Sequence, residues 1–137
     1  MTEKTITICG QQVKMRYCAA TEIGYEKLSD KSSAIFVPEV IKDENGTITD
    51  VKQNATLSDF VQLAIAGIIA AYDSENDDAP VTAKQILNEA AGNEVSKMVT
   101  TIVELRNDWY SVPNVAVTND DVEDDEDEEQ EEKGKNV

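Results

Sequence analysis

The residues of this chain best suited to chemistry are its two cysteines, Cys9 and Cys18. Thiols can form a disulfide, bind a metal ion or act as nucleophiles. Both lie in the stretch TITICGQQVKMRYC, on either side of Gly10. Apolar residues alternate with Thr, Lys and Arg before and after this glycine, a pattern typical of a β-hairpin. The distance between the two sulfur atoms therefore depends on the register of that hairpin.

A hairpin here places the two thiols too far apart to react with each other. Its turn can be Cys9-Gly10 or Gly10-Gln11, and the second suits a type II′ turn, which takes Gly in its first central position. In either register Cys18 is at least six residues along the strand from Cys9, which is about 20 Å at about 3.3 Å per residue. A disulfide tolerates a Cα separation of about 7 Å. We expect both cysteines to serve as small apolar residues.

Signals for other chemistry are missing from the sequence. The chain has no histidine, no CxxC pair, no GxSxG and no phosphate-binding glycine loop. The loop from Asp73 begins like a calcium-binding EF-hand, but its sixth and twelfth positions hold Asp78 and Lys84 instead of Gly and Glu. No basic stripe is present to neutralise nucleic-acid phosphates. We therefore expect a protein that is not an enzyme, with no catalytic residue, metal or cofactor, and that does not bind nucleic acid.

Most of the net charge of -16 comes from one segment near the C-terminus. Of the 28 acidic residues, 11 lie between Asp120 and Glu132. The preceding residues carry 17 acids and 10 bases, a net charge of -7 that is ordinary for a domain of this size. Because like charges repel and the segment has little apolar surface to bury, we expect a disordered tail. The predicted organisation is one domain over residues 1–117 and an acidic tail over residues 118–137.

The sequence also predicts where the protein resides. The N-terminus lacks a basic segment followed by a long apolar run, so no signal peptide is expected. The most apolar segment, residues 63–72, is much shorter than the roughly 20 residues that span a bilayer. We expect a cytoplasmic protein that is not secreted, has reduced thiols and makes no membrane contact.

The first half of the chain predicts two short helices and a loop. Thr21 is a candidate cap for a helix through EIGYEKLSD, and Ser32 or Ser33 for a second helix through AIFVPEVI, although Pro38 opposes helix within it. Residues 42–54 are polar and contain Asn-Gly, which predicts a loop or the tip of a small hairpin.

A long apolar helix is predicted over residues 57–74. Thr56 and Asp59 resemble a capping box at its start. From residue 60 to 72 the helix is apolar on nearly every face, so other groups must surround it, from its own domain or from a partner. Gly67 and the neighbouring alanines offer a surface where another backbone can approach closely.

Two further helices are predicted in the second half. Thr82 and Gln85 form another capping box, Gly92 is the expected end of that helix, and Asn93 is the expected cap of the next. One apolar stripe at helical spacing follows in the final helix: Val95, Met98, Val99, Ile102, Leu105 and Trp109. The predicted fold class is α+β, an N-terminal β-hairpin followed by about four helices. Because a lone hairpin is marginally stable, it must pack on the helices or pair with another subunit.

This order of elements resembles the tail assembly chaperones of long-tailed, siphovirus-like bacteriophages and prophages. The resemblance rests on the start TITICGQQVKMRYCAATEIGYEKL, the apolar helix LSDFVQLAIAGIIAAY, the helix at TAKQILNEA and the end near DWYSVP, roughly residues 3–113. It implies a small, acidic, non-enzymatic protein that binds the hydrophobic tape-measure protein and keeps it soluble until tail-tube protein polymerises around it. It also implies self-association into a homo-oligomer.

Two other hypotheses stay open from the sequence. One is a structural component of the phage tail tube or head–tail connector, and the other is an acidic decoy that occupies a basic DNA-binding protein. The candidate partner-binding residues are apolar or aromatic and lie on the two longest helices, where they serve equally well as core: Leu57, Phe60, Val61, Ile65, Ile68, Ile69, Trp109 and Tyr110.

Overall fold

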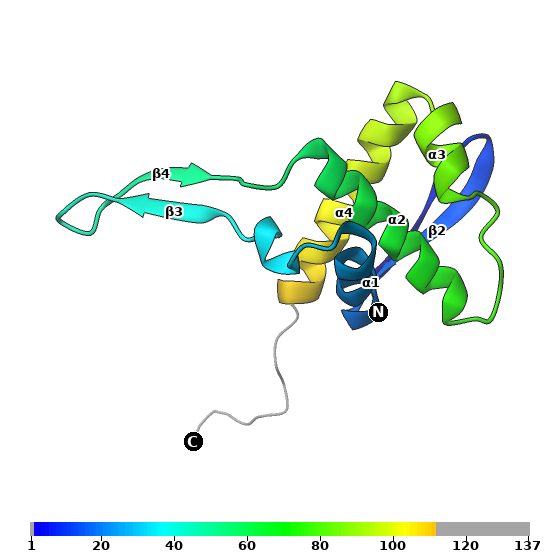
Figure 1. The fold of residues 1–137 in the computed structure, drawn as a ribbon, viewed down its shortest axis with the longest axis horizontal. Coiled ribbons are helices and arrows are strands. Elements are labelled where there is room, and N and C mark those ends of the chain that lie inside the picture. Colours follow the sequence, from blue (N-terminus) through cyan, green and yellow to red (C-terminus); the bar gives the residue numbers. More distant parts are fainter. Residues whose placement is uncertain (1, 112–137) are drawn as a thin grey trace, which may run out of the picture.

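The computed structural model describes residues 2–111. The elements in chain order are β1 (Thr2–Ile8), β2 (Gln11–Tyr17), α1 (Ala19–Ser29), the 3₁₀ helix η1 (Ser33–Phe36), β3 (Glu39–Lys42), β4 (Ile48–Lys52), α2 (Leu57–Asp73), α3 (Ala83–Glu89) and α4 (Gly92–Ser111). This arrangement confirms the predicted α+β class, with an N-terminal antiparallel hairpin and four α-helices (Figure 1). The predicted domain end at residue 117 and the acidic tail lie outside the described residues.

The first hairpin turns at Cys9 and Gly10. Ile8 pairs with Gln11 across the turn, and the two turn residues have φ of 52° and 75°. Positive φ at both central positions defines a type I′ turn, so the alternative turn at Gly10-Gln11 is not used. The apolar face is buried as the alternation predicted, with five core residues: Ile6, Ile8, Val13, Met15 and Tyr17.

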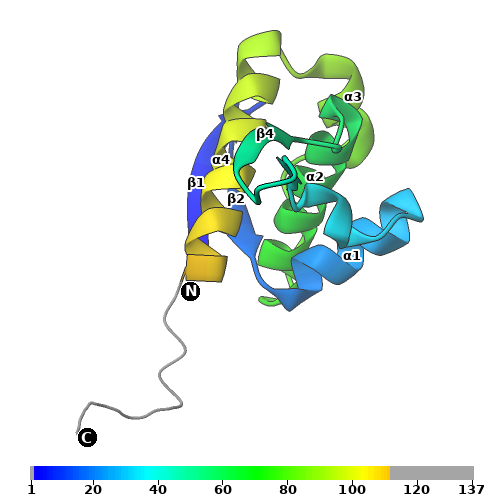
Figure 2. The same ribbon diagram turned by 90° about the vertical axis from the view of Figure 1, so that its left-hand side faces the viewer.

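Helix α2 is the centre of the body. It contacts α1 on one side and β2 and α4 on the other, as the two views show (Figures 1 and 2). A Cβ atom added to Gly67 would lie 3.1 Å from the carbonyl oxygen of Arg16 and 2.8 Å from Cδ1 of Ile102. The predicted close approach of another backbone is therefore confirmed at Gly67, and the approaching backbone is β2.

Two capping boxes are confirmed. The Thr56 hydroxyl accepts the N–H of Asp59 at 3.3 Å, and the Asp59 carboxylate accepts the N–H of Thr56 at 2.8 Å. The Thr82 hydroxyl accepts the N–H of Gln85 at 3.1 Å, and the Gln85 side chain accepts the N–H of Thr82 at 2.8 Å. Each box satisfies backbone donors that the first turn leaves free.

Two predicted helix caps are wrong. Thr21 is not the cap of α1, because the helix already begins at Ala19; its hydroxyl accepts the Cys18 N–H at 3.2 Å and donates to the Arg16 carbonyl at 2.7 Å. Gly92 and Asn93 lie inside α4, since the carbonyl of Ala91 already accepts the first helical hydrogen bonds.

The helix predicted through AIFVPEVI is also wrong beyond its first residues. Only Ser33–Phe36 is helical, capped by Ser32 as expected, and Pro38 prevents continuation. The chain then forms the β3–β4 hairpin, which confirms the hairpin alternative for the segment that follows. We call residues 39–52 the arm. It extends away from the helical body (Figure 1). Every residue of its two strands is exposed.

Candidate functional site: a groove between α1 and α2

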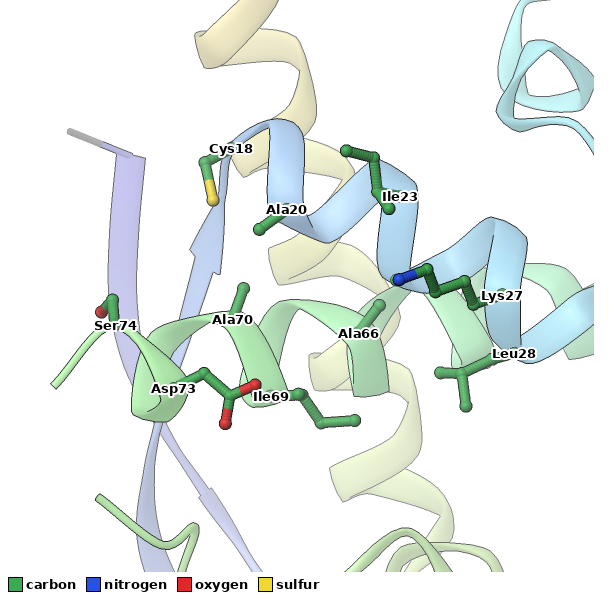
Figure 3. Close-up of a pocket in the computed structure, with 11 residues that line it drawn as sticks. Cys18, Ala20, Ile23, Lys27, Leu28, Ala66, Ile69, Ala70, Asp73 and Ser74 are labelled. Atoms are coloured by element: carbon green, nitrogen blue, oxygen red, sulfur yellow. The ribbon is translucent and has the colours of Figure 1, made fainter. Parts of the chain in front are cut away.

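A groove lies between α1 and α2, with a volume of about 620 Å³ (Figure 3). Apolar and small residues make up most of its lining: Cys18, Ala20, Ile23, Gly24, Lys27, Leu28, Ala66, Ile69, Ala70, Asp73 and Ser74. All of them come from these two helices or their ends. The groove is therefore a helix–helix surface that no other described element covers.

Small side chains form the floor of the groove. Ala20 of α1 and Ala70 of α2 point toward one another across the space between the helices (Figure 3). A Cβ atom added to Gly24 would lie 3.4 Å from the Cβ of Ala66, so the helices approach closely at this point. Because these side chains are short, the floor stays low and leaves room for another molecule above it.

Large apolar side chains border this floor. Ile23 and Leu28 on α1 are 53% and 50% exposed, and Ile69 on α2 is 42% exposed. Single exposed apolar residues are ordinary, but these three line one groove. Lys27 and Asp73 add one charge of each sign to the lining. A low floor between apolar walls is the shape that an amphipathic helix enters with its apolar face.

The structure divides the candidate residues of α2 into three groups. Val61, Ile65 and Ile68 are buried, so in this structure they are core residues, not surface for a partner. Phe60 is half-buried and packs its ring 5.2 Å from that of Phe36. Leu57, in the first turn, is 66% exposed and lies outside the groove. Of the predicted candidates, Ile69 is the one that lines the groove.

Trp109 and Tyr110 lie at the end of α4, outside the groove. The Trp109 ring is 5.4 Å from that of Tyr17, and Tyr110 donates a hydrogen bond to Glu22. Tyr17 donates to the same carboxylate at 2.8 Å, and burial, followed by this hydrogen bond, raises the pKa of Tyr17. These contacts attach α4 to α1 and β2, so both aromatic residues have a structural role here.

The groove residues of α1 were missed by the sequence reasoning. Ile23 and Leu28 were treated only as part of a short capped helix. A signal was present, because Ala20 and Gly24 are four residues apart and place two small residues on one face of the helix. The pairing of this face with the alanines of α2 is a tertiary contact that neither helix reveals alone.

The Cys9 thiol shows no sign of activation. Both cysteines are free and half-buried. Burial raises the pKa of Cys9, and the carboxylates of Glu94 and Glu89 raise it further. A raised pKa keeps a thiol protonated and therefore a poor nucleophile. Within residues 2–111 no group of three or more Cys, Asp or Glu side chains is arranged to hold a metal ion.

Comparison with known proteins gives no assignment. No protein-family model, curated protein or solved structure matches this chain. No α-helix within residues 2–111 combines the length and the apolar content needed to cross a bilayer.

Proposed function

We propose that this protein is a phage tail assembly chaperone, which holds an apolar helical segment of the tape-measure protein in the groove between α1 and α2. The single observation that supports this function best is the gathering of Ile23, Leu28 and Ile69 around a floor of small residues. A chaperone of this class needs exposed apolar surface that fits a helix, and this groove supplies it.

The size of the groove suits reversible binding. Burying an apolar side chain fully contributes about 1.5–3 kcal/mol, and these three are already about half-covered. Their further burial contributes a few kcal/mol at most, before the entropy lost on association is subtracted. Each contact is then weak enough for tail-tube protein to displace the chaperone, and many copies along a long client together keep it soluble.

The charge of the chain supports the same function. A bound chaperone adds a net charge of -16 to an apolar client, and like-charged complexes repel one another. Bacterial cytoplasm, where tails assemble, is the corresponding location. In this proposal the acidic residues keep the complex soluble, and apolar contacts in the groove bind the client.

A structural tail-tube or head–tail connector role is the second candidate, favoured by the exposed arm, which could join a sheet between subunits. Mass spectrometry of finished particles separates the two. A chaperone is absent from them, and a structural component is present in stoichiometric amounts.

Co-expression with the tape-measure protein tests the proposal directly. The double variant Ile23→Lys/Leu28→Lys places two charges on the groove wall and should leave the tape-measure protein insoluble. Leu87→Lys is the matched control, because Leu87 is 66% exposed on α3 and does not line the groove. It should keep the client soluble and co-purifying. Equal loss or equal retention of client with both variants would contradict the proposal.

A further inference from the structure

The arm is a two-stranded sheet that extends away from the helical body. Among residues 2–111 its two strands pair only with each other, and all their residues are exposed. A sheet of two strands is marginally stable by itself, and three or more strands with an apolar face are usually needed. Val40, Ile41, Ile48 and Val51 are 40–57% exposed on this arm. The arm therefore gains stability from any strand that pairs with it.

The backbone of Val51 shows that β4 offers an open strand edge. Val51 lies opposite Val40 across the arm, but its N–H is donated to Oδ1 of Asp50 at 2.8 Å. In an antiparallel pair, alternate residues direct their N–H and C=O groups away from the partner strand. We infer that the N–H of Val51 is directed away from β3, because it donates to the side chain of Asp50.

We propose that the arms of two copies of this chain pair antiparallel along β4, with Val51 opposite Val51 of the second copy. The result is a four-stranded sheet with two-fold symmetry. The N–H and C=O groups of the two Val51 residues then bond to each other, and Asp50 is released from its local hydrogen bond. This inference concerns self-association and does not depend on the groove binding a client.

Charge complementarity selects this register. A two-fold axis across an antiparallel strand pair passes through a residue that lies opposite its own copy. Centred on Val51, the pairing sets Asp50 opposite Lys52 of the second copy, and this ion pair occurs twice. Centred on Asp50 it would set two carboxylates opposite each other, and centred on Thr49 it would set Asp50 opposite Ile48. Opposite charges across strands stabilise and like charges destabilise a sheet.

The apolar side chains agree with the same register. Val40 and Val51 are cross-strand partners and therefore share one face of the arm. Centring the pair on Val51 joins this row to the same row of the second copy. Four valines then cross the sheet side by side, while the ion pairs lie on the other face. The self-complementary edge is why the occupant is a second copy of the chain.

Disulfide trapping tests the register even if the association is weak. In a chain carrying Cys9→Asn and Cys18→Ser, Val51→Cys should form a covalent dimer on mild oxidation, because directly opposite residues bring their Cα atoms to about 5.5 Å. Thr49→Cys and Ile41→Cys are matched controls. In this register Thr49 lies about 13 Å from its own copy, and Ile41 lies on the outer strand. The proposal would be overturned if a control variant formed covalent dimers as fast as Val51→Cys, or if Val51→Cys formed no dimer.

Charge reversal gives an independent test by sedimentation over a range of concentrations. Asp50→Lys alone and Lys52→Asp alone should each weaken self-association about tenfold, because each sets like charges opposite twice. An equimolar mixture of the two variants should restore association, since every Lys then meets an Asp. Circular dichroism checks that both variants stay folded. Failure of the mixture to associate, or single variants that associate like the parent chain, would refute the pairing.

Discussion

The hydroxyl of Tyr25 donates a 3.0 Å hydrogen bond to Oδ1 of Asp59, which attaches α1 to the first turn of α2. Lys31 donates to the same oxygen at 3.0 Å, and the other carboxylate oxygen accepts the N–H of Thr56. Asp59 is 1% exposed. One buried carboxylate therefore holds together the two helices that line the groove, and its ionisation should control their packing.

Acid should destabilise the fold through Asp59. The backbone N–H of Thr56, opposed by burial and aided by Lys31, lowers the pKa of Asp59 from 3.8 to about 2. A carboxyl whose pKa is lower in the folded state stabilises the fold above its unfolded pKa, and that contribution is lost as pH falls from about 4 to about 2. The shift corresponds to about 2 kcal/mol. Urea unfolding should show that the difference in unfolding free energy between the parent and Asp59→Asn shrinks over this pH range. A difference independent of pH would contradict the assignment.

Gly67→Ala should destabilise the fold, because its Cβ would press on the Arg16 carbonyl and on Ile102. Overpacking of this kind costs about 1–3 kcal/mol. Gly92→Ala is the control, since an added Cβ there meets nothing within 4 Å. Thermal unfolding should show a lower Tm for the first variant and little change for the second. Equal Tm values would mean that α2 and β2 adjust freely.

The first turn should be improved by replacing its cysteine. Cys9 has φ of 52°, and Asn tolerates positive φ better than most residues and is preferred before Gly in type I′ turns. Cys9→Asn should raise the unfolding free energy by about 0.5–1 kcal/mol, a part of the roughly 1–2 kcal/mol that left-handed backbone costs most residues. Gly10→Ala should lower it, because Gly10 has φ of 75°. Chemical denaturation of both variants checks the opposite signs. A type II′ turn at Gly10-Gln11 would keep the loss for Gly10→Ala but give no gain for Cys9→Asn.

Salt should separate the roles of charge and apolar surface. Raising ionic strength from about 0.1 M to about 1 M shortens the Debye length from about 10 Å to about 3 Å. Client binding in the groove should survive this change and also deletion of residues 118–137, whereas solubility of the complex should fall. Loss of the partner under both conditions would instead favour the acidic decoy, and a pull-down at both salt concentrations decides between them.

The sequence predicted the elements whose signals are local. The period-two alternation around Gly10 and the boxes at Thr56 and Thr82 gave the first hairpin and the starts of α2 and α3. Both possible turn registers preserved the alternation, so the turn itself stayed open until the structure showed Cys9-Gly10.

The misses involve context that the sequence does not carry locally. The sequence predicts a helix through AIFVPEVI with Pro38 opposing it, and the strand that begins at Glu39 is decided by pairing with β4. The groove depends on the packing of α1 against α2. The small residues of its floor and the Ile and Leu residues of its walls form one surface only after the two helices pack together.

Chemical-shift mapping shows whether a helical client occupies the groove between α1 and α2. Backbone amides of the ¹⁵N-labelled chain are recorded while an amphipathic helical peptide from the tape-measure protein is added. We predict shifts that cluster on Ala20, Ile23, Gly24, Leu28, Ile69 and Ala70, and their loss in Ile23→Lys/Leu28→Lys. Shifts confined to the arm or to α3, or no shifts at all with a peptide that the full-length chain keeps soluble, would contradict this prediction.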